Sequence, residues 1–137
     1  MNKVQIGKVF PIFVILTAAG LVLFWIGFFT IGLAPDKPPA GYFAYEHSFP
    51  VCDITLAVVL LIGSIWSLKG QARGITLLAA GGGALVFLGI LDISFNLQNG
   101  MYSISVMDMI LNAFINLWCV IFGAVIVAKM MRISRAA

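Results

Sequence analysis

Long apolar runs separated by short polar segments dominate the chain. Four runs contain neither Lys nor Arg, and each approaches or exceeds the length of about 20 helical residues that crosses a bilayer. They span about 9–33, 51–68, 75–97 and 104–128, and the longest polar connection is a predicted outer loop over 34–49. The pattern therefore predicts an all-α fold, an integral membrane four-helix transmembrane bundle formed by a single domain over 1–137.

Composition agrees with a membrane protein. Hydrophobic residues make up 62% of the chain and charged residues 9%, whereas a soluble domain has about a quarter of its residues charged. A signal peptide would also begin with basic residues, but its apolar region covers only about 7–15 positions, so the first run is predicted to be a transmembrane helix. The net charge of +3 comes from residues scattered at helix ends, and we expect no nucleic-acid partner.

The basic residues also predict an orientation. Seven of the eight flank one side of the predicted spans, and Lys37 alone falls on the other side. By the positive-inside rule, this is a multi-pass cell-membrane protein with both termini cytoplasmic. The acids fall at or near the opposite, outer face. The cytoplasmic set is Lys3, Lys8, Lys69, Arg73, Lys129, Arg132 and Arg135.

Two segments that begin predicted spans resemble each other. The stretches 48–56 and 103–111 share Ser, Val, Asp and Leu at corresponding positions, which places Asp53 opposite Asp108. A duplication would make the chain two tandem helical hairpins related by pseudo-two-fold symmetry about the membrane normal. Chance similarity between apolar segments explains the match equally well, so both interpretations stay open.

Polar residues form two stripes at helical spacing. Asp108, Asn112 and Asn116 are four residues apart, and so are Asp92 and Asn96. Because unpaired polar groups are costly in lipid, the two stripes are predicted to face each other. Asp53 and two residues of the outer loop can complete the cluster. The predicted ligand-binding set is Glu46, His47, Asp53, Asp92, Asn96, Asp108 and Asn112.

Each member of this set also has a structural explanation. Asp53 and Asp108 lie in the first turn of a helix, where a carboxylate gains about 0.3–1 kcal/mol and can cap free N–H groups. Asp92 lies near a helix carboxyl end, where the dipole disfavours an anion, so we expect it to be buried against a polar partner. His47 alone is more typical of a solvated loop histidine. Trp25, Trp66 and Trp118 are interpreted as packing residues or interfacial anchors.

Three functions fit these residues. The favoured one is a small membrane protein whose outward-facing acidic pocket binds or transports a cation, a proton or a cationic small molecule. The alternatives are an accessory or assembly subunit of a larger membrane complex, and a membrane enzyme that acts on a lipid-like substrate with an acid and His47 as proton-transfer groups. Binding is favoured over catalysis, and no catalytic residue is assigned.

The ligand itself is less constrained. Oxygen donors outnumber nitrogen and sulfur donors, which suits a hard cation such as Ca²⁺ better than Zn²⁺, but the sequence assigns neither a metal nor a cofactor. The expected partners are the lipid bilayer and either further copies of the chain or a larger membrane protein. Four helices are few for a pore, so transport would require an oligomer.

Overall fold

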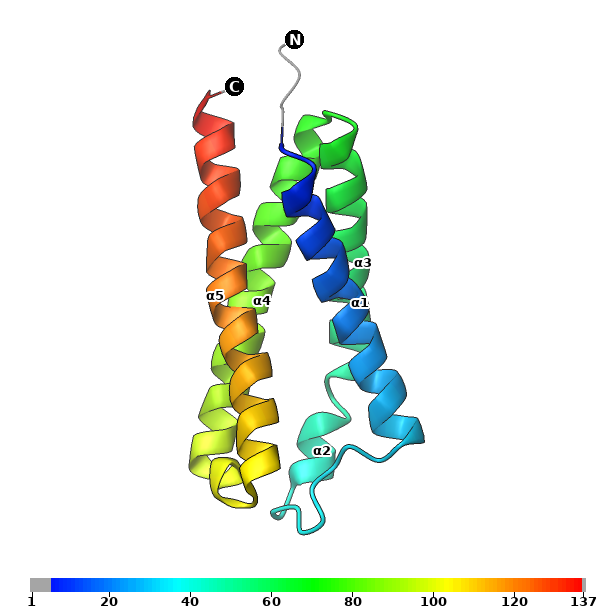
Figure 1. The fold of residues 1–137 in the computed structure, drawn as a ribbon, viewed down its shortest axis with the longest axis vertical. Coiled ribbons are helices and arrows are strands. Elements are labelled where there is room, and N and C mark those ends of the chain that lie inside the picture. Colours follow the sequence, from blue (N-terminus) through cyan, green and yellow to red (C-terminus); the bar gives the residue numbers. More distant parts are fainter. Residues whose placement is uncertain (1–5, 137) are drawn as a thin grey trace.

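The protein is an all-α bundle of antiparallel helices (Figure 1). The computed structural model describes residues 6–136, so Lys3 of the predicted cytoplasmic set lies outside the described residues. Four helical segments are long and apolar enough to cross a membrane, which confirms the predicted fold class and implies a lipid environment. The long helices are α1 (Val9–Thr30), α3 (Pro50–Leu68), α4 (Ala72–Gln98) and α5 (Val106–Ala136).

The short elements lie in the connections. Helix α2 (Tyr42–Glu46) falls within the predicted loop 34–49, and the 3₁₀ turn η1 (Met101–Ser103) joins α4 to α5. Helix α1 ends at Thr30, before the predicted boundary, because Gly32 adopts a left-handed φ of 79° and its N–H closes onto the Gly27 carbonyl. Helix α5 extends beyond the predicted span, so its last turns carry the basic residues of the carboxyl-terminal segment.

Successive long helices run in opposite directions, and this places most of the basic residues at one end of the bundle and the acidic residues at the other. The start of α1, the α3–α4 turn and the end of α5 lie at one end of the bundle, and α2 and η1 lie at the other (Figure 1). Lys69 and Arg73 flank the α3–α4 turn, whereas Glu46 and Asp53 belong to α2 and the first turn of α3. The basic and acidic ends are therefore separated along the bundle axis.

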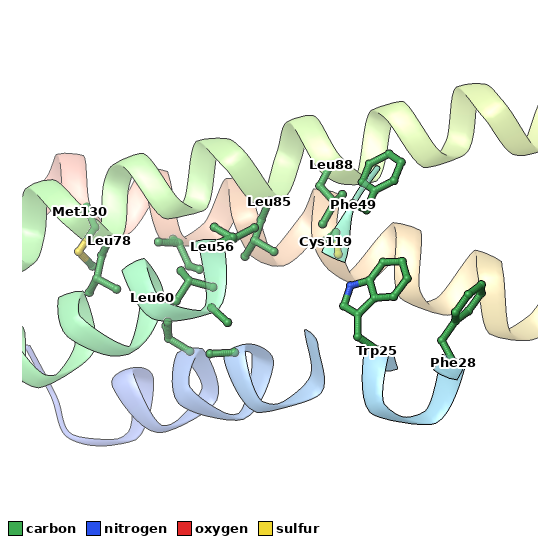
Figure 2. Packing of buried hydrophobic residues seen from close by; sticks show 14 of the residues in the cluster. Trp25, Phe28, Phe49, Leu56, Leu60, Leu78, Leu85, Leu88, Cys119 and Met130 are labelled. Atoms are coloured by element: carbon green, nitrogen blue, oxygen red, sulfur yellow. The ribbon is translucent and has the colours of Figure 1, made fainter. Parts of the chain in front are cut away.

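Helix α4 packs between α3 and α5 and forms the centre of the bundle. Leu60, Leu78 and Leu85 are fully buried in this region (Figure 2). A Cβ added at Gly82 would lie 2.9 Å from the Gly123 carbonyl oxygen, and one at Gly123 would lie 2.6 Å from the Gly82 carbonyl oxygen. Only glycine permits this approach of α4 and α5, as expected where small residues mediate helix packing in lipid.

Helices α1 and α5 form the open side of the arrangement. Helix α1 packs on α3, α3 on α4, and α4 on α5. A closed bundle with exact pseudo-two-fold symmetry would pair the α3–α4 interface with an equivalent α5–α1 interface. Here α1 and α5 meet through side chains, including a Phe10–Phe122 ring contact with centroids 6.0 Å apart. The two hairpins are present, but the two interfaces between them differ.

Candidate functional site

A cavity of about 390 Å³ lies between α1 and α5, with α4 behind it and α2 and the start of α3 at one end. Besides aliphatic side chains, its wall includes carboxylates, amides and aromatic rings. The carboxylates are Glu46, Asp53 and Asp92, and the amides are Asn96, Asn112 and Asn116. The aromatic rings are Phe13, Phe24, Trp25, Phe49, Phe114 and Trp118.

Asp53 is held by a donor from another helix. It follows Pro50, the first residue of α3, and its side chain is 6% exposed. Trp25 Nε1 donates a 2.8 Å hydrogen bond to Asp53 Oδ2 and thereby joins α1 to α3. The indole is itself fixed by edge-to-face contacts with Phe24 and Phe28. Asp53 thus serves as an acceptor between helices, with its partner in the apolar interior (Figure 2).

Asp92 has an aromatic donor of its own. The hydroxyl of Tyr45, in α2, donates a 2.9 Å hydrogen bond to Asp92 Oδ1. The Tyr45 ring also stacks on Phe95 of α4, with centroids 3.8 Å apart and an interplanar angle of 4°. These contacts hold α2 against the end of α4. Glu46, the next residue in α2, lines the cavity beneath.

The asparagines continue the polar wall along α4 and α5. Asn96 is 4% exposed and Asn116 is 2% exposed. Asn116 Nδ2 donates a 3.0 Å hydrogen bond to the Tyr102 hydroxyl, and Asn112 Nδ2 donates one of 2.8 Å to the Asp108 carbonyl. The amides of the two helices therefore line one cavity, and part of their hydrogen-bonding capacity is used within the protein.

Two residues of the predicted set lie away from this wall. Asp108 forms a reciprocal cap with Ser105: Ser105 Oγ accepts a 3.0 Å bond from the Asp108 N–H and donates one of 2.6 Å to Asp108 Oδ2. His47 is exposed, and its ring lies against Phe29 and Phe43, with centroid distances of 5.7 and 5.9 Å. The structure thus brings together Glu46, Asp53, Asp92, Asn96 and Asn112, but not His47 or Asp108.

The cavity is acidic without a compensating base in its wall. Among the described residues, its lining includes no Lys, Arg or His. Within residues 6–136, no three His, Cys, Asp or Glu side chains are close enough together to hold a metal ion. The cavity acids therefore do not form a metal-binding cluster.

Side chains from α1 and α5 meet in the part of the cavity away from α2. Trp118 Nε1 donates a 3.1 Å hydrogen bond to Thr17 Oγ1, which joins the two helices directly. Closer to the α1 start, the Lys129 ammonium lies 4.1 Å from the centroid of the Phe10 ring. Cys119, which is 4% exposed, lies on the wall beside Trp118.

Sequence reasoning missed the donors of this site. Trp25 and Trp118 were interpreted as packing residues or interfacial anchors, yet each donates a hydrogen bond between helices, and so does Tyr45. The available signal was chemical: an indole N–H or a phenol at membrane depth needs an acceptor. Their partners could not be identified, because the pairs join segments far apart in the chain.

Comparison of the chain with protein-family models, with curated proteins and with solved structures gave no match. The fold and the cavity define a small multi-pass membrane protein with acids and aromatic rings on the wall of an intramembrane cavity. Its function is therefore argued from that cavity.

Proposed function

We propose that this protein binds an organic cation in the cavity between α1 and α5. Glu46, Asp53 and Asp92 supply the negative charge, and the surrounding rings supply apolar faces that attract an ammonium group. The observation that carries the proposal is the presence of three carboxylates on an aromatic wall that, within the described residues, includes no basic side chain.

An organic cation suits this wall better than a bare metal ion or a proton. Ca²⁺ takes about 6–8 oxygen ligands at roughly 2.3–2.6 Å, a shell that needs converging donors. In the described part of the chain, no three His, Cys, Asp or Glu side chains lie close enough together to hold such an ion. The volume of about 390 Å³ falls within the range of about 300–1,000 Å³ for small-molecule sites. The aromatic rings that line the cavity would add nothing to the binding of a proton.

The proposed setting is a cell membrane with both termini in the cytoplasm. This orientation is supported by the basic residues at the α3–α4 turn and the end of α5, which the positive-inside rule assigns to the cytoplasmic side. The acids of the cavity then lie in the outer half of the bilayer. Transport across the membrane would need a further assembly of copies or a larger partner, so the proposal is one of binding.

The two alternative functions account for less of the site. An enzyme using an acid with His47 would need the two side chains together, whereas His47 lies against Phe29 and Phe43 and lines no part of the cavity. An assembly subunit would account for the Trp25–Asp53 and Tyr45–Asp92 bonds as contacts that fix helix pairing, but not for the cavity that these acids line.

Ligand-dependent melting in phosphatidylcholine nanodiscs tests the proposal. Benzyltrimethylammonium should raise the melting temperature, because a ligand that binds only the folded state stabilises it. Its neutral isostere neopentylbenzene should not. Asp53→Asn and Asp92→Asn should each weaken binding about tenfold or more, since hydrogen bonds to charged groups contribute about 1.5–3 kcal/mol.

The matched control is Asp36→Asn, which removes an exposed acid of the outer loop away from the cavity. It should bind like the wild type. The proposal is wrong if benzyltrimethylammonium leaves wild-type melting unchanged, if Ca²⁺ or Na⁺ stabilises the protein in its place, or if Asp36→Asn weakens binding as much as Asp53→Asn does.

A further inference from the structure

The outer end of the cavity is covered by helix α2. Tyr45 fixes this helix through its hydrogen bond to Asp92 and its stack on Phe95. Phe49, which follows α2, is 9% exposed and lines the cavity, with its ring 4.7 Å from that of Tyr45. A ligand arriving directly from the outer aqueous side would meet this cover.

The side of the cavity between α1 and α5 is open by comparison. Three residues of its wall are also exposed on the outside of the bundle: Phe13 at 47%, Leu16 at 60% and Phe114 at 64%. The cavity wall therefore continues into the outer surface between the two helices. In a membrane this surface faces lipid acyl chains.

The cavity changes character along the membrane normal. The acids lie towards its outer end: Glu46 is on α2, Asp53 is in the first turn of α3 and Asp92 is near the end of α4. Along α1, the wall extends from Trp25 to Phe13, twelve residues or about 18 Å at 1.5 Å per residue. The inner part is lined by Phe13, Leu16 and Trp118, and the Thr17–Trp118 hydrogen bond lies within it. The site thus has a charged outer end and an apolar inner end.

We propose that the ligand is a single-chain cationic amphiphile that enters from the outer leaflet through the opening between α1 and α5. Its ammonium head lies beside Asp53 and Asp92, and its chain extends inward towards Phe13 and Trp118. This inference rests on the proposed function, because the same acids hold the head. A chain leaving lipid for this apolar wall gains little free energy, so selection from the bilayer comes from pairing the head with the acids.

The probe is a dodecyltrimethylammonium ion with bromine on its terminal chain carbon, added to phosphatidylcholine nanodiscs. Bromine quenches nearby tryptophan fluorescence, and in Trp66→Phe the remaining described indoles are Trp25 at the acidic end and Trp118 at the inner end. The fluorescence that disappears when Trp118→Phe is added to Trp66→Phe comes from Trp118 and therefore reports the inner end. This second substitution leaves the Trp25–Asp53 bond intact. The neutral control is the bromododecanol of the same chain length.

The cationic probe should quench the Trp118 emission at about tenfold lower membrane content than the alcohol, and Asp53→Asn should remove this difference. Gly20→Leu tests the opening itself, because Gly20 lines the cavity and an added Cβ meets nothing within 4 Å. It should weaken binding of the long-chain ion at least tenfold. Gly83→Leu, at an equally open position outside the cavity, should leave binding unchanged.

The outcomes separate this inference from the proposed function. If benzyltrimethylammonium stabilises the protein but the long-chain ion quenches Trp118 no better than the alcohol, the cavity binds cations and the amphiphile inference is wrong. Equal binding of the long-chain ion by wild type and Gly20→Leu would also overturn entry between α1 and α5. If neither cation binds, both proposals fail.

Discussion

Trp25 Nε1 lies 2.8 Å from Asp53 Oδ2 and donates a hydrogen bond that joins α1 to α3 within the apolar interior. Both side chains are buried, at 4% and 6% exposure. At this depth neither an indole N–H nor a carboxylate can turn to bulk water, so each residue satisfies the other. The acid is thereby kept on the cavity wall in a fixed orientation.

Trp25→Phe should lower the free energy of unfolding by about 1–3 kcal/mol, because it leaves the buried carboxylate of Asp53 without its donor. Asp53→Asn alone should also destabilise the protein. The double variant should lose less unfolding free energy than the sum of the losses in the two single variants. Equilibrium unfolding in detergent micelles measures this coupling. Trp66→Phe serves as the control for loss of an indole elsewhere. Strict additivity would show that the Trp25–Asp53 bond contributes nothing.

Tyr45→Phe should loosen α2 without removing the ring stack on Phe95, because it deletes only the hydroxyl that bonds Asp92. Amide hydrogen exchange over Tyr42–Glu46 should become about tenfold faster, as expected for the loss of about 1.4 kcal/mol. Tyr102→Phe removes a hydroxyl bonded to Asn116 on the other connection and should leave this exchange rate unchanged. Unaltered exchange in Tyr45→Phe would contradict the role given to the Tyr45–Asp92 bond.

Gly82→Leu should destabilise the bundle by about 1–3 kcal/mol, because an added Cβ already lies 2.9 Å from the Gly123 carbonyl oxygen. Its neighbour Gly83 faces open space, with nothing within 4 Å of an added Cβ. Gly83→Leu should therefore be neutral or slightly stabilising, since leucine has the higher helix propensity. Thermal unfolding of the pair measures the difference, and equal melting temperatures would contradict the close α4–α5 contact.

The proposed orientation predicts opposite labelling at the two ends. In a Cys52→Ser, Cys119→Ser background, Asp36→Cys places a thiol in the exposed outer loop and Ser134→Cys places one near the end of α5. A membrane-impermeant maleimide added to intact cells should label only the former, and permeabilisation should expose the latter. The reverse pattern would place the termini outside and the acidic end of the cavity in the inner leaflet.

The fold was accessible from the sequence because its signals are local. The length of each apolar run, the basic residues beside it and the four-residue spacing of Asn112 and Asn116 depend only on helical geometry. The cap of Asp108 was also available: Ser105 three residues earlier is the first member of a capping pair, and the structure has that pair.

The remainder of the site depends on contacts between distant segments. Nothing local to Trp25 or Tyr45 identifies Asp53 or Asp92 as its acceptor. The difference between Asp53 and Asp108, which a duplication would make equivalent, arises because α1 supplies an indole to one and Ser105 caps the other. The position of the cavity between α1 and α5 likewise depends on how all the helices pack together.

Reactivity of Cys119 tests the central claim most directly, because this thiol lies on the cavity wall beside Trp118. The measurement is the rate of its reaction with methyl methanethiosulfonate in Cys52→Ser protein in nanodiscs. Benzyltrimethylammonium at ten times its dissociation constant should slow the reaction about tenfold, since only unoccupied protein reacts. Asp92→Asn at the same ligand concentration should lose most of this protection. If Cys52→Ser protein that retains Asp92 reacts at the same rate with and without the cation, binding in this cavity is contradicted.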